Sequence, residues 1–530
     1  MALARQPKDV LSAVLRCSER LTKANFAALS DGLGASVPGP MAPPASDHRF
    51  DDPAWRDNAA FRLLEQWYLV AAETSRELVD VAAVDPMTRA KATFIANLII
   101  DAVAPTNLLL TNPAALQKAF QTGGLSVLRG GRTFLQDVAT NKGRPRQVDA
   151  SSFRVGRDLA ATPGKVVYRS DLIELIQYEA QTDTVFETPL LASPPWINKY
   201  YIMDLAPKRS FIEWAVTHGH TTFAISYRNP DASMRDLSLD DYLLGGPLAA
   251  LDVIADITGA DQANIVGLCL GGTLTAMLLA WLAQDGSKRV RSVTLLNSLL
   301  DFSEPGVLGA FTDAESVERL IKKMSKRGYL EGSEMAGTFD SLRANDLIWN
   351  YVAANWLMGQ KPPAFDILAW NADSTRMPAA MHAFYLRSCY VDNALAKNTL
   401  ELAGRVLRLD DITTDTYLLA AKEDHIAPWR SSYKATSLLK SEMRFVLSSS
   451  GHIAGIVNPP SPKARHWTNL DLSASADAWL ASAESHEKSW WEDWATWIEG
   501  RAGTRRRPPR VGSKHNPPID DAPGTYVLEK

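Results

Sequence analysis

The stretch "GLCLGG", residues 267–272, constrains the fold of this chain more than any other feature. It continues the apolar run "ANIVGL" and leads into "TLTAMLLAWLAQ", whose apolar residues recur at helical spacing. G-x-C-x-G is the spacing of a nucleophile elbow, with Cys269 where serine is usual. Such a nucleophile stands on a tight strand-to-helix turn, and Gly267 and Gly271 leave room for the backbone to double back. The segment therefore predicts a reactive thiol at the edge of a sheet.

Short β-rich runs alternate with helical segments from about residue 151 onward. The stretch "GKVVYRSDLIELIQYEA" predicts a β-hairpin, and further strands are expected at "TPLLAS", "TTFAISY", "VRSVTLLNS", "DTYLLAA" and "MRFVLSS". This alternation indicates a mainly parallel sheet with helices on both faces. Together with the elbow it predicts an α/β-hydrolase fold.

The chain has 530 residues, more than the roughly 250 to 300 that one core supports. Residues 1–150 are expected to form a mainly helical N-terminal domain, because "AFRLLEQWYLVAAETSRELVDVAA" repeats apolar residues at three- and four-residue steps. Within it, residues 1–49 contain "VPGPMAPP" and are predicted to be extended or mobile. Residues 151–530 form the predicted catalytic domain. An insertion over about 302–402, rich in Met, Trp and Tyr and without an evident strand, is expected to cap the sheet edge. Near the end of the chain, "SWWEDWATWI" predicts a helix packed on the core.

Composition excludes several classes of protein. The formal net charge is −4, so no global basic field indicates nucleic acid as a partner. Three cysteines far apart in the chain suit a reducing cytosol rather than a disulfide framework. The early apolar stretch "FIANLIIDAVAPTNLLL" is interrupted by Asp101 and Pro105, so we expect no transmembrane anchor. We also expect neither a metal nor another cofactor.

An elbow needs an acid and a histidine, in the chain order nucleophile, acid, histidine. "DTYLLAAKEDHIAPW" places Asp424 just after a predicted strand, and "MRFVLSSSGHIAG" places His452 just after the next one. Both then lie on the same sheet edge as Cys269. His425 is a rival base or a supporting residue, but adjacent side chains usually diverge, so His452 is the preferred partner of Asp424.

Two backbone donors complete the predicted site. The N–H of Leu270 is the first expected oxyanion donor, since it directly follows the nucleophile. The second is expected from "SPPWINKYYIMDL", at the backbone around Trp196 and Ile197. The alternative for this segment is a rigid turn packed by Trp196 and Tyr200.

Six motifs carry a resemblance to a known family. These are "PPWINKYYIMDL", "SYRNPDASM", "GLCLGGTL", "NDLIWNYV", "KEDHIAPW" and "GHIAGIVNPP" followed by "HWTN". In this order they resemble the polyhydroxyalkanoate synthases over about residues 50–530. The resemblance implies a catalytic Cys269, Asp424 and His452 and an oxyanion role for Leu270. "GHIAGIVNPP" is similar to the single-subunit class I enzymes, whereas "WNADSTRMPAAMH" looks closer to class II.

The resemblance also implies a reaction and a setting. The expected activity is polymerisation of (R)-3-hydroxyacyl-CoA, foremost 3-hydroxybutyryl-CoA, into a polyester with release of CoA. The expected partners are the growing chain, the granule surface, a second copy in a homodimer and granule-coat proteins (phasins). The expected location is the cytoplasm, at polyester granules.

Two rival functions remain at this point. One is a thioesterase or other hydrolase on the same fold, which would yield soluble hydroxy acid. The other is a non-enzymatic granule-surface protein, in which Cys269 would be dispensable. Of the remaining thiols, Cys389 is expected to be a packed side chain and Cys17 to lie in the mobile segment.

Overall fold

The computed structural model describes residues 2–32 and 37–530, which divide into two compact units. Unit 1 contains Met1–Asp149 and Gly337–Ala364, and unit 2 contains Ala150–Ala336 and Phe365–Lys530. The division after Asp149 falls close to the boundary that the sequence predicts. Residues 337–364 belong to unit 1, however, although the sequence assigns them to the insertion of the catalytic domain.

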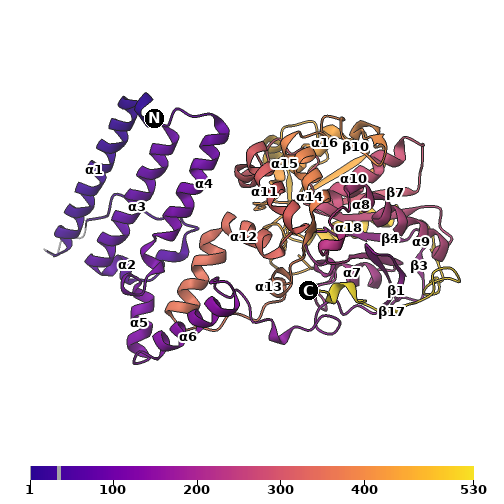
Figure 1. The fold of residues 1–530 in the computed structure, drawn as a ribbon, viewed down its shortest axis with the longest axis horizontal. Coiled ribbons are helices and arrows are strands. Elements are labelled where there is room, and N and C mark those ends of the chain that lie inside the picture. Colours follow the sequence, from indigo (N-terminus) through magenta and orange to yellow (C-terminus); the bar gives the residue numbers. More distant parts are fainter. Residues whose placement is uncertain (1, 33–36) are drawn as a thin grey trace. The chain divides into compact units, whose positions relative to one another are not determined.

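Unit 1 is built from helices, three of which lie side by side (Figure 1). Its helices are α1 (Pro7–Gly32), α2 (Ala54–Asp57), α3 (Ala59–Asp80), α4 (Pro86–Ala102), α5 (Pro113–Gln121) and α6 (Leu125–Thr140). Helix α3 packs between α1 and α4. Asp85 and Asn112 cap the first turns of α4 and α5 through their side chains, and a proline follows each cap.

Helix α1 corrects the prediction for residues 1–49. The sequence indicates an extended or mobile segment, but a long helix forms and packs on α3, where Arg20 Nη1 donates to Glu77 Oε1 at 2.8 Å. The Pro-rich stretch 37–44 is free of helix, as expected. The helix forms because one face of α1 packs on the unit, where its small residues are buried. The prolines affect only the stretch that follows it. The rest of that prediction, at residues 1 and 33–36, lies outside the described residues.

Contacts far apart in the sequence explain why residues 337–364 join unit 1. Asp137 of α6 is fully buried, and its Oδ2 accepts from Trp356 Nε1 at 2.9 Å. Its Oδ1 accepts from Arg146 Nε at 3.0 Å. A Cβ at Gly130 would lie 1.9 Å from the carbonyl oxygen of Trp356, so the two backbones touch. The buried carboxylate and the close backbone approach are therefore among the contacts that hold the segment, together with hydrogen bonds such as that from Asn345 to Asp101 at 2.8 Å.

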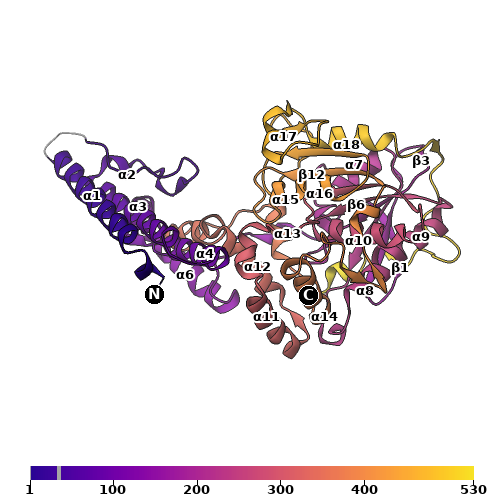
Figure 2. The same ribbon diagram turned by 90° about the horizontal axis from the view of Figure 1, so that it is seen from above.

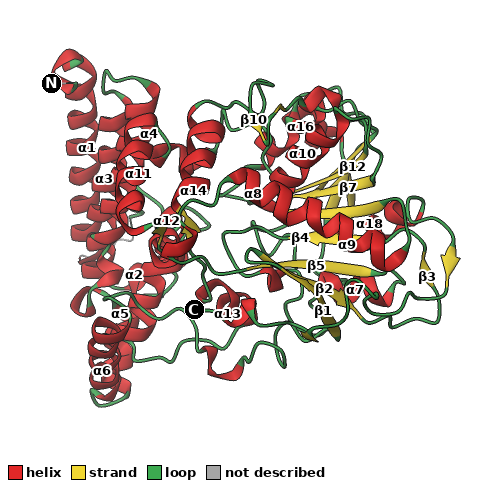
Figure 3. Cartoon of the chain, turned by 45° about the vertical axis from the view of Figure 1, so that its right-hand side comes forward, coloured by secondary structure: helices red, strands yellow, loops and turns green. Residues whose placement is uncertain are grey.

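Unit 2 is organised around one mixed sheet of eleven strands. In spatial order these are β15 (Glu484–His486), β14 (His466–Thr468), β13 (Met443–Ser448), β12 (Asp415–Ala421), β7 (Val290–Leu296), β6 (Ala263–Leu268), β4 (Leu190–Ser193), β5 (Thr222–Tyr227), β2 (Ile173–Tyr178), β1 (Gly164–Arg169) and β17 (Asp520–Asp521). Neighbours from β13 to β5 run parallel, and the outer strands are antiparallel. Figure 3 shows these strands fanned from β12 to β1.

Helices cover both faces of this sheet. Strands β5 and β6 are buried along their whole length, as expected for strands covered on both sides. On β7, Thr294 Oγ1 accepts from Trp494 Nε1 at 2.9 Å, whereas Val293 and Leu295 belong to the core cluster that includes α10. Figure 2 shows α7 and α18 on one side of the strands and α9 and α10 on the other. The predicted parallel sheet with helices on both faces is confirmed.

The helices of unit 2 follow the expected alternation. They are α7 (Phe211–Thr217), α8 (Leu239–Leu243), α9 (Ala249–Thr258), α10 (Leu270–Ala283), α11 (Ala314–Arg327), α13 (Asp366–Ala372), α14 (Ala379–Tyr385), α15 (Trp429–Tyr433), α16 (Ala435–Leu438), α17 (Ala476–Ser482) and α18 (Trp490–Glu499). Helix α12 (Gly332–Leu342) crosses the division between the units. In α18, Trp490, Trp491 and Trp494 are buried, so the packed-helix prediction is confirmed.

Short strand pairs lie outside the main sheet. They are β8 (Tyr329–Leu330) with β9 (Met377–Pro378), β10 (Glu401–Leu402) with β11 (Arg405–Val406), and β16 (Arg505–Arg506) with β3 (Val185–Phe186). The pair β8–β9 lies in the predicted insertion, where the sequence shows no strand pattern, because two residues are too few to establish a period. Among the described residues, no helix combines the length and apolar character needed to cross a bilayer.

Candidate active site

Cys269 stands at the turn between β6 and α10. Its backbone has φ 51° and ψ −117°, a conformation that residues other than glycine rarely adopt. The turn is held by main-chain bonds: the Cys269 N–H donates to the carbonyl of Leu296 on β7 at 2.8 Å, and its carbonyl accepts from the N–H of Thr273 at 3.1 Å. Strained backbone of this kind persists only where the surroundings determine it, and it gathers at functional sites. The structure thus has the geometry of a nucleophile elbow.

Three glycines make this turn sterically possible. A Cβ at Gly267 would lie 2.5 Å from the Cα of Gly272. A Cβ at Gly271 would lie 2.1 Å from the carbonyl oxygen of Ser193, at the end of β4. A Cβ at Gly272 would lie 1.9 Å from Ser298 Oγ. The G-x-C-x-G pattern does not specify a glycine at this position. The elbow therefore packs directly on β4 and on the segment after β7.

Asp424 and His452 meet as the chain order predicts. Asp424 follows β12 and His452 follows β13, and these parallel neighbours end at the same edge of the sheet. His452 Nδ1 lies 2.6 Å from Asp424 Oδ2, and both side chains are buried. The other carboxylate oxygen, Oδ1, accepts from the N–H groups of Ile426 and Ala427 at 2.8 and 2.9 Å. Asp424 is therefore fixed by its own loop and presented to the imidazole.

The charge of His452 is set by its neighbours. Burial by itself lowers the pKa of the imidazole, but the negative charges of Asp424 and Cys269 and the hydrogen bonds to both outweigh it. The pKa of His452 therefore lies well above its ordinary value of 6.5. The protonated imidazole and the positive N-terminal end of α10 both lie beside the sulfur. His452 thus bonds to Asp424 and lies next to Cys269.

His425 lies next to Asp424 on the same loop and is half-buried. The carboxylate of Asp424 is hydrogen-bonded to His452. A supporting role for His425 stays a prediction.

The two expected oxyanion donors belong to the elbow itself and to the loop that follows β4. The N–H of Leu270 is the first of α10, a position that has no acceptor within its own helix. Ile197 lies in a turn after β4, and Gly271 touches the backbone of Ser193 and Pro194 in that same segment. Ile197 and Cys269 also pack against the same core cluster. The loop after β4 thus lies beside the elbow. The roles of Leu270 and Ile197 as donors stay predictions.

Aromatic side chains of the insertion pack against Trp196 and against one another. The ring centroid of Tyr385 lies 5.8 Å from that of Trp196 and 5.6 Å from that of Tyr390. Phe302 stacks edge-on against Tyr390 at 4.9 Å. Burial raises the pKa of both tyrosines. The insertion is rich in aromatic residues, but no periodic pattern singles these out, because η12 (Leu386–Val391), which carries Tyr390, is a π-helical turn without a regular period.

Asn297 is a second residue that the motifs do not reveal. It directly follows β7, has φ 47°, and its Nδ2 donates to the carbonyl of His452 at 2.6 Å. It therefore fixes the backbone of the histidine loop. An asparagine at the carboxyl end of a buried strand is the only signal in the sequence.

The other two thiols have different surroundings. Cys389 is completely buried, and burial raises the pKa of its thiol to about 12, so it stays protonated near neutral pH. This agrees with the predicted packed thiol. Cys17 is half-buried on α1 rather than in a mobile segment. Within residues 2–32 and 37–530 no group of three or more His, Cys, Asp or Glu side chains is arranged to hold a metal ion.

A strand–elbow–helix turn, with a buried Asp–His pair after β12 and β13 of the same parallel sheet, defines the α/β-hydrolase class, here with cysteine in the place of the nucleophile. The family model of the alpha/beta hydrolase fold matches residues 193–459, and that of the poly-beta-hydroxybutyrate polymerase (PhaC) N-terminus matches residues 46–215. The chain belongs to the poly(3-hydroxyalkanoate) polymerase (PhaC) family.

Three relatives of known name show the extent of the similarity. A poly(3-hydroxyalkanoate) polymerase subunit PhaC of Rhizobium meliloti (strain 1021) is 43% identical over 93% of this chain and 81% of its own length. A poly(3-hydroxyalkanoate) polymerase of Methylorubrum extorquens is 41% identical over 99% of this chain and 88% of its own length. A subunit PhaC of Cupriavidus necator is 42% identical over 92% of this chain and 84% of its own length. The similarity thus spans both units.

Proposed function

We propose that this chain polymerises (R)-3-hydroxyacyl-CoA, foremost 3-hydroxybutyryl-CoA, into a polyester through an acyl-Cys269 intermediate. Membership of the polymerase family supports the reaction, and the elbow supports the intermediate. The single observation that carries the mechanism is the set Cys269, His452 and Asp424, in which a buried carboxylate holds one imidazole nitrogen and the imidazole lies beside the thiol at the elbow. The set supplies a nucleophile and a proton carrier in one place.

The first half-reaction exchanges one thioester for another. The Cys269 sulfur, its proton held by His452, attacks the acyl carbonyl, and the oxyanion receives hydrogen bonds from the N–H groups of Leu270 and Ile197. The carbon–sulfur bond to CoA breaks, and His452 gives its proton to the departing CoA thiolate. Acyl-Cys269 and free CoA result.

The second half-reaction makes the ester bond. The 3-hydroxyl of the next acyl unit, or of the chain end, gives its proton to His452 as its oxygen attacks the acyl-Cys269 carbonyl. The Cys269–acyl bond breaks, and the thiolate–imidazolium pair is restored. Conversion of a thioester into an oxoester is downhill, which drives elongation. Both carboxylate oxygens of Asp424 are engaged, one by His452 and one by main-chain N–H groups, and this favours an orienting role over direct activation of the hydroxyl.

We further propose that unit 1 contacts the polyester, so that the enzyme works at cytoplasmic granules. Helix α6 exposes large apolar side chains, among them Leu128 at 72% and Leu135 at 67%. Exposed apolar side chains gathered on one element indicate an interaction surface. The surface of an aliphatic polyester is a partner of matching chemistry. A homodimer and contact with granule-coat proteins belong to the same proposal, as the family resemblance implies.

The test supplies purified protein with 3-hydroxybutyryl-CoA and follows free CoA and turbidity in the same sample. The proposal predicts that both rise together with wild type and that neither rises with Cys269→Ala. Release of CoA with soluble 3-hydroxybutyrate and no turbidity would establish a thioesterase instead. Turnover by Cys269→Ala would refute the acyl-cysteine intermediate.

A further inference from the structure

The loop that carries the second expected oxyanion donor is fixed by parts of unit 2 far from it in the sequence. Between β4 and the 3-10 turn Tyr200–Ile202 the chain has no regular helix or strand. Its position therefore depends on contacts made by its neighbours. An oxyanion donor is useful only when it is held within a few tenths of an ångström of its working position, so these contacts bear on catalysis.

Lys199, two residues after Ile197, is the most deeply anchored side chain of this loop. It is only 3% exposed, and its Nζ donates to the carbonyl oxygens of Val527 at 2.9 Å and Glu529 at 2.6 Å. Burial lowers the pKa of this amine. A buried amine with two main-chain acceptors is costly to leave without them. The segment 525–530 is thus tied to the loop by a bond that neither partner can easily lose.

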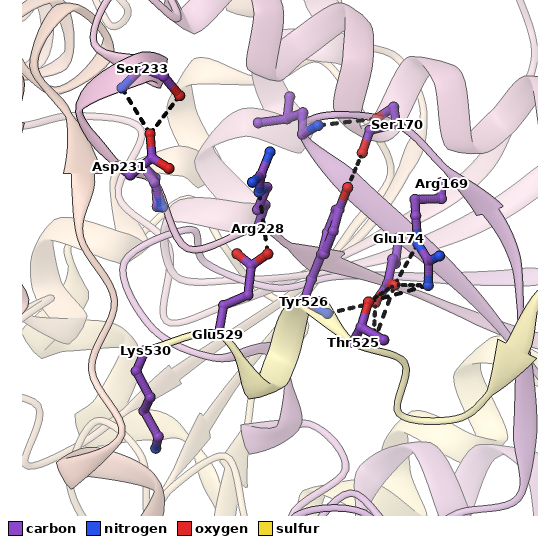
Figure 4. Close-up of polar contacts among 12 residues, drawn as sticks. Arg169, Ser170, Glu174, Arg228, Asp231, Ser233, Thr525, Tyr526, Glu529 and Lys530 are labelled. Atoms are coloured by element: carbon purple, nitrogen blue, oxygen red, sulfur yellow. Dashed lines mark hydrogen bonds and ion pairs between the residues drawn. The ribbon is translucent and has the colours of Figure 1, made fainter.

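The segment 525–530 is itself fixed on the sheet, as Figure 4 shows. Glu174 of β2 is completely buried and accepts from the N–H groups of Thr525 and Tyr526, each at 3.0 Å. The hydroxyl of Tyr526 donates to the carbonyl of Ser170 at 2.7 Å. Farther along, Glu529 pairs with Arg228 at 3.3 Å. The carbonyls that receive Lys199 therefore belong to a rigid part of the molecule.

The base of the insertion holds the same loop from another side. Trp370 Nε1 donates to the carbonyl of Lys199 at 2.8 Å. Asn198 forms a bridge with Ser374, and Thr375 Oγ1 donates to the carbonyl of Trp196 at 3.3 Å. Because these bonds use main-chain atoms of residues 196, 198 and 199, they fix the backbone on both sides of Ile197.

We propose that Lys199 is a positioning residue, which, through the carbonyls of Val527 and Glu529, holds the Trp196–Lys199 backbone where the N–H of Ile197 meets the oxyanion. The inference rests on the proposed acyl transfer at Cys269. Lys199 itself does not touch the reacting atoms. Loss of Lys199 should therefore impair reaction at the thioester carbonyl without changing the reactivity of the thiol. A general structural role would change both.

The experiment uses the full chain and two perturbations of the same contact. Lys199→Met removes the amine and keeps the aliphatic stem, whereas a chain shortened to end at Tyr526 removes both carbonyl acceptors and keeps the contacts of Glu174. Leu528→Gln is the matched control, because it alters an exposed side chain and leaves the main chain in place. Each variant is assayed for kcat and KM with 3-hydroxybutyryl-CoA, for alkylation of the Cys269 peptide by iodoacetamide, and for thermal unfolding.

We expect kcat to fall about tenfold to a hundredfold in both perturbed variants, since one oxyanion donor is displaced. KM should change little, and alkylation of Cys269 should stay within about twofold of wild type, because attack on iodoacetamide forms no oxyanion. The combined variant should lose no more than the shortened chain alone, since that chain already lacks both acceptors of Lys199 along with the Glu529–Arg228 pair. Leu528→Gln should match wild type.

Three results would overturn the inference. One is a kcat within twofold of wild type in either folded variant, another is an alkylation rate that falls in parallel with kcat, and the third is losses that multiply in the combined variant. If Lys199→Met does not fold, the shortened chain decides the question by the same criteria. Failure of the proposed function itself would show differently, as a wild-type enzyme that releases no CoA or a Cys269→Ala variant that does.

Discussion

Unit 2 buries large apolar side chains on both faces of its sheet, whereas unit 1 leaves many of its own exposed. The core cluster of unit 2 runs from β1 through α10 to α17, and that of unit 1 is a small group around Trp55 and Tyr68. Most of the exposed large apolar side chains described in the structure belong to the helices of unit 1. Burial in unit 2 fixes Cys269, His452 and Asp424 in one geometry. The difference supports the proposals that unit 2 carries the chemistry and that unit 1 offers an apolar surface to a partner.

The largest effect on turnover is expected from substitution of His452, the proposed proton carrier of unit 2. His452→Gln should lower turnover by about a hundredfold or more, because the proton of Cys269 and of the attacking hydroxyl loses its acceptor. His425→Gln should lower it by less than about tenfold, since Asp424 bonds to His452. The measurement is steady-state CoA release by folded variants. Equal losses in the two would refute the assignment of His452 as the base.

The pH dependence of stability offers a second readout of the same residue. The folded pKa of His452 lies above its ordinary 6.5, so its protonation stabilises the fold fully below that pH. The contribution disappears as pH rises through the raised folded pKa. The difference in unfolding free energy between wild type and His452→Gln should therefore shrink as pH rises above 6.5. A difference that grows with pH would contradict the raised pKa.

Alanine substitutions at two glycines test the close packing of unit 2 against the open surface of unit 1. Gly271→Ala should destabilise the chain by about 2 kcal/mol or more, since the new Cβ would overlap the carbonyl oxygen of Ser193. Gly131→Ala, inside α6 with no atom within 4 Å of its Cβ position, should be neutral or stabilise by up to about 1 kcal/mol. Chemical denaturation followed by tryptophan fluorescence and circular dichroism measures both. Tolerance of alanine at 271 would show that the elbow is looser than the structure has it.

The smallest kinetic effect is expected on α6. Leu128→Gln with Leu135→Gln should leave early CoA release within about twofold of wild type but lower the fraction of enzyme that sediments with polyester, because apolar contact area is lost. Leu470→Gln, at a position of unit 2 that is 87% exposed, is the matched control and should sediment as wild type does. Equal partitioning of all three proteins at equal polymer mass would remove the proposed role of unit 1.

The fold and the residues of the site could be predicted because their signals are local in the sequence. The pattern around Cys269 identifies the elbow, and the order Asp424 then His452 follows from strands whose ends share an edge. Lys199 could not be found in this way, because its acceptors are main-chain carbonyls of Val527 and Glu529, which no side-chain type identifies. The same reason hides the hydrogen bond from Asn297 to the carbonyl of His452.

The attachment of residues 337–364 to unit 1 also could not be predicted from the sequence. It depends in part on Asp137, whose carboxylate accepts from Arg146 nearby in the sequence and from Trp356 in the distant segment. An isolated aspartate on an amphipathic helix gives no sign of a buried partner. Local period and composition therefore predict elements and motifs, while the choice of neighbours follows from packing that only the folded chain shows.

The most direct test of the account is to find where the acyl group resides during turnover. Wild-type enzyme is mixed with 3-hydroxybutyryl-CoA, quenched in acid within the first turnovers, digested and examined by mass spectrometry, with Cys269→Ala as the control. We expect 3-hydroxybutyryl units, singly and in short ester chains, on the peptide that contains Cys269 and on no peptide of the variant. Acyl groups on another residue, or acylation that persists in Cys269→Ala, would contradict it.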